Sequence, residues 1–160
     1  MRLRTRIHHN NNLLIFLIGI LAFVGCGSDT VYHHYEQVTA DGWNRNDTLR
    51  FHVAPAKSDA VLHEEVELRI NSAFPFMGLC LIVEHTTFPS NVRRIDTLNF
   101  ALIDKNGKAK GKGINYIQNH FHLIDLSVNQ DDSIEIAIHH NMKRENLPGI
   151  IDLGILLRSY

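Results

Sequence analysis

The histidines are the first residues whose type and spacing could do chemistry, because the chain has 11 of them. His120 and His122 stand two residues apart in an alternating stretch, so on a β-strand both imidazoles would point to one face. Zinc needs three or four ligands that converge on one point, and His63, although followed by Glu64, has no second histidine at the HExxH spacing. We therefore expect strand histidines without a ligand role, and neither a metal nor another cofactor.

The glycine- and lysine-rich segment 107–113 is the second chemical candidate. A phosphate-binding P-loop needs four residues between its two glycines, and then Lys followed by Ser or Thr. Here three residues separate Gly107 from Gly111, and Gly113 follows Lys112. We expect a solvated hairpin instead, whose lysines could contact anionic lipid or glycan. These lysines are Lys105, Lys108, Lys110 and Lys112.

Residue patterns for nucleophilic or acid–base catalysis are missing from the sequence. There is no Gly-x-Ser-x-Gly motif. Cys80 lies in an apolar run, where its thiol would resist ionisation and the residue is most simply a small buried hydrophobic residue. Neighbouring carboxylates such as Glu64 and Glu65 diverge to opposite faces of a strand, so they do not form an acid–base couple. We therefore predict a protein that is not an enzyme.

Two aromatic residues complete the candidate binding surface. Trp43 stands in a polar segment, where it could stack on a sugar or plug the end of the fold, and we favour the plug because a lone Trp normally buries its large apolar area. Phe76 follows Pro75 and is first interpreted as a core or corner residue. The candidate surface consists of Trp43, Phe76, Lys108, Lys110 and Lys112.

Short alternating segments must position these side chains, and long helical periodicity is nearly absent. Val66, Leu68 and Ile70 alternate with two charged residues, which predicts one buried and one wet face. The predicted strands span 31–38 at an edge, 48–53, 66–70, 76–83, 96–103, 113–117, 121–128, 134–138 and 151–157. This spacing predicts an all-β fold, an antiparallel β-sandwich of the jelly-roll or immunoglobulin-like kind.

Several details of the strands can also be predicted. The run 76–83 is apolar almost throughout, so we expect a central strand covered on both faces. Residues 104–107 predict a tight turn, after which 113–117 would return antiparallel to the preceding strand. The alternation slips between Leu123 and Ile124, which predicts a β-bulge, and 141–146 is the single candidate for a helical turn.

The N-terminus has the three parts of a secretion signal, namely basic residues, an apolar core from Leu13 to Val24, and small Gly25 before Cys26. This arrangement resembles the bacterial lipobox, which implies cleavage after residue 25 and a lipid on Cys26. The alternative is a plain signal anchor with Cys26 as a bystander. The expected domains are a signal peptide over 1–25, a lipidated tether with an edge strand over 26–40, and a β-sandwich over 41–160.

The charge balance excludes one class of partner. Removing the signal takes away three arginines and leaves 13 basic against 17 acidic residues. A nucleic-acid-binding protein would show a basic excess, so we expect no nucleic acid partner.

Residues spaced along the whole mature chain carry a family resemblance. They include Cys26, then Trp43 followed by Asp47, Leu49 and Phe51, and the C-terminal cluster Met142, Arg144, Leu147, Gly149, Ile150, Asp152 and Gly154. On these residues the chain resembles the GldH gliding-motility lipoproteins of the Bacteroidetes.

The resemblance implies a non-catalytic protein of the cell envelope, anchored to the inner or outer membrane through Cys26. It also implies association with envelope proteins of the gliding and type 9 secretion machinery. The alternative is a lipid-anchored carbohydrate-binding β-sandwich, which requires Trp43 or Phe76 exposed in a concave patch.

Overall fold

The computed structural model describes residues 30–159. The expected signal peptide 1–25, the lipidation site Cys26 and the first tether residues 27–29 lie outside the described residues. Within 30–159, no helix is long and apolar enough to cross a membrane.

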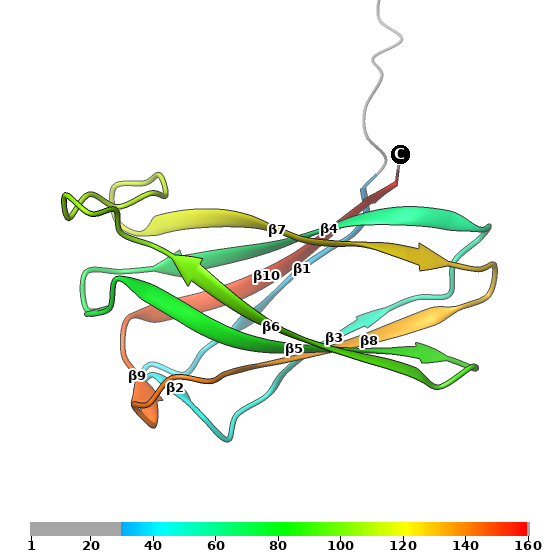
Figure 1. Ribbon diagram of the computed structural model, residues 1–160, viewed down its shortest axis with the longest axis horizontal. Coiled ribbons are helices and arrows are strands. Elements are labelled where there is room, and N and C mark those ends of the chain that lie inside the picture. The colour runs from blue at the N-terminus through cyan, green and yellow to red at the C-terminus, as the bar shows by residue number, and fades with distance from the viewer. Residues whose placement is uncertain (1–29, 160) are drawn as a thin grey trace, which may run out of the picture.

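The described chain forms an antiparallel β-sandwich, as the alternating segments predicted (Figure 1). Its strands are β1 (Thr30–Gln37), β2 (Trp43–Asn44), β3 (Leu49–Val53), β4 (Ala60–Ile70), β5 (Gly78–Phe88), β6 (Val92–Ala101), β7 (Ile117–Val128), β8 (Ser133–His140), β9 (Asn146–Leu147) and β10 (Ile150–Ser159). The first sheet has the order β1-β10-β4-β7 and the second sheet β3-β8-β5-β6, while β2 and β9 form a separate pair. The predicted edge position of β1 is confirmed.

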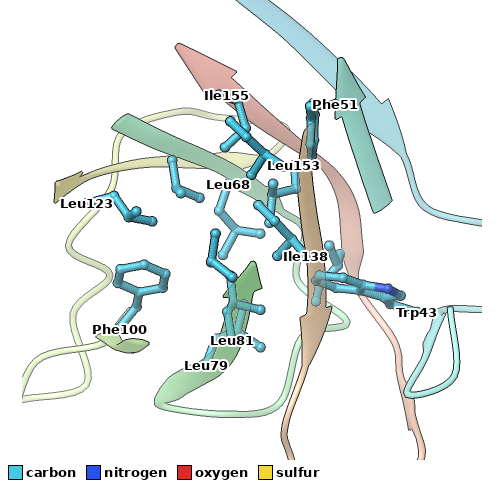
Figure 2. Close-up of a cluster of buried hydrophobic side chains, with 14 of the residues drawn as sticks. Trp43, Phe51, Leu68, Leu79, Leu81, Phe100, Leu123, Ile138, Leu153 and Ile155 are labelled. Atoms are coloured by element: carbon cyan, nitrogen blue, oxygen red, sulfur yellow. The ribbon is translucent and has the colours of Figure 1, made fainter. Parts of the chain in front are cut away.

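Alternate residues of both sheets fill the space between them with aliphatic and aromatic side chains (Figure 2). Leu68 and Leu153 of the first sheet and Leu81 of the second have no measurable exposure. Burying each such side chain contributes roughly 1.5 to 3 kcal/mol, so this layer supplies the main stabilising term. Trp43 lies at the margin of the cluster and closes one end of it.

Strand β10 is buried on both faces, although its sequence alternates. Leu153 and Ile155 point inward, but Asp152 and Leu156 on the outer face are also only 4% exposed. The outer face is covered because the side chains of the neighbouring strands lie across it. A Cβ atom at Gly154 would lie only 2.7 Å from Cε1 of Tyr35, so the glycine makes room for that ring.

Strand β5 is less buried than the sequence predicted. It is central in the second sheet and extends from Gly78 to Phe88, beyond the predicted end at 83. Only its inner face is fully buried, while Cys80 and Ile82 on the outer face are half-buried. The prediction of a strand covered on both faces was therefore wrong, because no segment of residues 30–159 is stacked outside the second sheet, and Cys80 is not a core residue.

The predicted return strand at 113–117 and the helical turn at 141–146 are also wrong. The turn itself forms, with the Asp104 carbonyl accepting from the Gly107 amide at 3.0 Å. The chain then crosses to the other sheet, where β7 pairs with β4 rather than with β6. Residues 141–145 form an irregular segment that leads into β9, because Asn146 and Leu147 pair with β2.

Candidate functional site

The candidate binding residues predicted from the sequence lie at one end of the sandwich. Ile70 pairs with both Ile150 and Ile117, so the segments beyond these residues emerge together. We call this end, formed by residues 71–77, 102–116 and 141–149, the loop end; it lies on the left in Figure 1. The opposite end, where β1 begins at Thr30 and β10 finishes at Ser159, is the terminal end.

Trp43 at the loop end is not a surface residue, because its side chain is only 1% exposed. Its indole Nε1–H donates to the Asp47 carbonyl at 3.0 Å, and its ring packs edge to face with His140 at 5.5 Å. His140 Nε2 donates to the Trp43 carbonyl at 3.0 Å, and burial lowers the pKa of this histidine. Trp43 therefore occupies the plug position rather than a ligand-binding one.

The remaining candidates at the loop end differ in exposure. Phe76 is half-buried and packs edge to face against Phe74, with the ring centroids 5.5 Å apart. Lys108, Lys110 and Lys112 are all exposed. The same loop also exposes two apolar side chains that the sequence analysis did not single out, Ile114 at 100% and Tyr116 at 38%.

A polar network covers the outer face of the first sheet, and Glu67 of β4 is its centre. The side chain of Glu67 is only 4% exposed, although it points away from the core. Its carboxylate accepts from the Tyr35 hydroxyl and from His33 Nε2 at 2.9 Å, and His120 Nδ1 lies 3.1 Å away. Three strands therefore meet at one carboxylate, and the expected wet face of β4 is in fact buried at this point.

The network sets the protonation of its members. Burial alone would raise the pKa of Glu67, but the hydrogen bonds from Tyr35 and His33 and the charge of His120 outweigh burial, so the net pKa lies below the usual 4.5. Burial and the hydrogen bond to Glu67 raise the pKa of Tyr35. Tyr35 therefore stays a protonated donor to an ionised carboxylate.

Arg69 extends the network toward the loop end. Its Nε donates to Asp152 Oδ1 at 2.6 Å, and this bond raises the pKa of the guanidinium. The guanidinium also lies 4.3 Å from the ring centre of Tyr35 and 5.4 Å from that of Tyr116. Arg69 thus connects strands β1, β4 and β10 with the lysine-bearing loop.

A second polar pair lies inside the sandwich. Glu64 of β4 and His85 of β5 are 0% and 3% exposed, and their Oε2 and Nε2 atoms are 2.9 Å apart. This hydrogen bond joins the two sheets across the core. Glu64 Oε1 and His85 Nδ1 have no further partner within the described chain.

The carboxylates of the outer face accept hydrogen bonds from neighbouring side chains. Glu67 and Asp152 both bind cationic or hydrogen-donating side chains, and Glu65 accepts from Arg158 at 3.0 Å. The arrangement can hold an ordered charged surface in place. It does not present a nucleophile beside a general base.

Sequence reasoning missed the network because its members come from four strands. Tyr35, Glu67, His120 and Asp152 come from one strand each, are separated by up to 117 positions in the chain and meet only through the sheet register. The one local signal was the alternation of Glu67 and Arg69 with the apolar residues of β4. It placed them on the outer face but did not show what would cover them.

Comparisons with known proteins agree with the sequence resemblance. A family model described as GldH lipoprotein matches residues 30–157. The gliding motility lipoprotein GldH of Flavobacterium johnsoniae is 28% identical over 156 residues, which cover 93% of this chain and 96% of that protein.

Solved structures give weaker matches. A family 35 carbohydrate-binding module from Clostridium thermocellum is 9% identical, covers 81% of this chain and 98% of its own, and has a TM-score of 0.39. Eiger TNF from S. frugiperda is 8% identical with coverages of 81% and 93% and the same TM-score of 0.39. No functional conclusion follows from either match.

Proposed function

Because the chain belongs to the GldH lipoprotein family, we propose that it acts without catalysis, by binding proteins of the gliding and type 9 secretion machinery. The family membership makes it a membrane-anchored lipoprotein of the cell envelope that is linked to gliding motility. The proposed lipid attachment point is Cys26. The proposed partner surface is the loop end.

The observation that carries this proposal is the position of the loop end relative to the anchor. Cys26 precedes Thr30 by four residues, which can span at most about 14 Å. Thr30 lies at the terminal end, and β4 has 11 residues, so in a molecule that stands upright on its anchor the loop end would be about 30 Å farther from the membrane. In that orientation the exposed lysines would face away from the anchoring bilayer and toward other envelope proteins.

The chemistry of the loop end favours a protein partner over the anchoring lipid. Lys108, Lys110 and Lys112 give a basic surface, and the fully exposed Ile114 adds an apolar contact. Such a surface complements an acidic protein patch that has an apolar centre. Contact with the anionic lipid of its own membrane would require the sandwich to lie on its side.

The non-catalytic role is supported by the outer-face network. Its most buried carboxylates, Glu67 and Asp152, are held by Tyr35, His33 and Arg69. Oxygens that already accept hydrogen bonds from these side chains are not free to take a proton from a substrate. The network instead fixes the sheet that carries the loop end.

Site-specific photocrosslinking in the native cells tests the proposed partner surface. A photoreactive residue at Lys110 of the loop end should capture components of the gliding or secretion machinery, identified by mass spectrometry. The matched control is Lys57, an equally exposed lysine of the loop between β3 and β4 at the terminal end. Capture from Lys57 but not from Lys110 would contradict the proposal.

Charge reversal gives a second test. With the photoreactive residue kept at position 110, Lys108→Glu together with Lys112→Glu should abolish the same crosslinks while leaving the melting temperature unchanged, because both side chains are exposed. The carbohydrate-binding alternative required Trp43 or Phe76 to be exposed; it is not favoured, since Trp43 is buried and Phe76 is half-buried against Phe74. Specific retention on envelope glycans, with no protein crosslinked from the loop end, would restore it.

A further inference from the structure

A second cluster on the outer face of the first sheet lies away from Glu67 and toward the terminal end. His63 of β4 faces His122 and Asp125 of β7. Each of the three residues offers one ligand atom, and these atoms all lie within 4.8 Å of one another. We infer that His63, His122 and Asp125 bind a divalent transition-metal ion of the Zn²⁺ type.

The predicted β-bulge of β7 assembles this cluster. His63 is opposite Asp125 and Glu65 is opposite His122, so Glu64 between them faces the two residues Leu123 and Ile124. In a regular strand, residues 122 and 125 would point to opposite faces. The additional residue brings Asp125 back to the face that holds both histidines.

The distances are close to those that zinc requires. Nδ1 of His63 and Oδ1 of Asp125 are hydrogen-bonded at 3.0 Å, a bond that the ion would replace, and two ligands of one tetrahedral zinc are about 3.4 Å apart. The rings of His63 and His122 are stacked, with centroids 4.1 Å apart and planes 9° from parallel. Small side-chain rotations at an accessible surface would therefore bring three ligand atoms around one ion.

The donor set selects the class of metal. Two imidazoles and one carboxylate suit zinc and similar ions, whereas calcium and magnesium prefer oxygen ligands alone. Within residues 30–159, His122 makes a ring contact with His63 but no hydrogen bond, so its nitrogens are available. A fourth position remains for water.

The neighbouring group of Glu65, Glu67 and His120 is the weaker candidate on the same face. Its ligand atoms also approach within 4.8 Å, but two of the three are carboxylates. Glu67 is buried and already accepts from Tyr35 and His33, and Glu65 accepts from Arg158. Metal binding there would break hydrogen bonds to a buried carboxylate, whereas at the first cluster it would replace a solvent-exposed hydrogen bond between two of the ligands themselves.

Zinc titration of the purified mature protein, prepared without a histidine tag, tests the inference against a competing chromophoric chelator. We expect one zinc ion per chain with a dissociation constant in the micromolar range or tighter. His122→Asn and Asp125→Asn should each weaken binding by about tenfold or more, because each removes a ligand. Both residues are exposed, so the metal-free variants should keep the wild-type melting temperature.

Two control variants make the result specific. His120→Asn alters the neighbouring group, and His52→Asn alters an exposed histidine of the second sheet; neither should change the affinity. Substitution with Co²⁺ should give the strong visible absorption of a four-coordinate ion, which His122→Asn should abolish. Affinity that is unchanged in His122→Asn and Asp125→Asn, or lost in His120→Asn instead, would overturn the inference, as would the absence of zinc binding by the wild type.

Discussion

Strand β4 places glutamates with histidine partners on both of its faces, and the two faces hold them differently. Inside the sandwich, the only hydrogen-bond partner of the Glu64 side chain among the described residues is His85, and Glu64 Oε1 and His85 Nδ1 have none there. On the outer face, Glu67 is shared by Tyr35, His33 and His120. The same residue types therefore form an isolated link between sheets in one place and a shared network in the other.

The difference lies in what each arrangement can tolerate. The inner pair is buried away from solvent, so its contribution depends on both residues together. The outer network borders solvent, and its central residue Glu67 has several donors, so one loss can be partly compensated.

Breaking the inner pair should have the largest effect on stability. His85→Ala should lower the free energy of unfolding by about 3 to 5 kcal/mol, because it leaves the Glu64 carboxylate buried without a partner. Urea denaturation of the purified protein measures this change.

The matched control is the double variant Glu64→Leu with His85→Leu. Replacing both members by apolar side chains should bring stability back to within about 1 kcal/mol of the wild type or above it. If the double variant is as unstable as His85→Ala, the pair contributes more to stability than each residue's supply of a hydrogen-bond partner to the other. The contrast with the outer face would then be wrong.

Disrupting the outer network should have a smaller effect. Glu67→Gln keeps the side-chain volume and one acceptor oxygen but removes the charge, so we expect a loss of about 1 to 2 kcal/mol. Tyr35→Phe removes one of the donors and should cost about 1 kcal/mol. Losses for Glu67→Gln that equal those for His85→Ala, measured by the same denaturation, would remove the distinction between the faces.

The pH dependence of stability should distinguish the contribution of Glu67 from that of His140. The pKa of Glu67 is lowered on folding, so its contribution is present above its unfolded value of 4.5 and is lost as the pH falls through the folded pKa. The pKa of buried His140 is also lowered, so its contribution is present above 6.5 and is lost below that pH. The melting temperature should therefore fall in acid from below pH 6.5, and more steeply below pH 4.5.

Glu67→Gln provides the test of this assignment. The variant should keep the loss that begins below pH 6.5, because His140 is unchanged, and should lose the steeper part below pH 4.5. An identical acid profile in wild type and variant would show that Glu67 is not the group responsible.

The smallest effect is expected on the outer face of the second sheet. Arg50 and Glu135 form an ion pair at 2.6 Å, but the Arg50 side chain is 56% exposed. Arg50→Ala should therefore change the free energy of unfolding by less than about 0.5 kcal/mol. A change comparable to that of Glu67→Gln would mean that exposure does not separate the two outer faces.

The sequence alone predicted the features that are coded locally. Period-two alternation identified the all-β class and most strands, because a strand between core and surface must alternate. The turn at residues 104–107 and the slip between Leu123 and Ile124 were also identified, since both depend on a few adjacent residues. Strand ends were less accurate, as in β4, which begins six residues before the predicted strand.

Only the tertiary structure decided which strands are neighbours. The predicted return of 113–117 failed because β7 pairs with β4 across the sandwich, and no local pattern specifies that partner. The register of β1, β10, β4 and β7 then brought together the network around Glu67 and the cluster around His63. The residue types were visible in the sequence, but their convergence depends on long-range pairing and on one bulge.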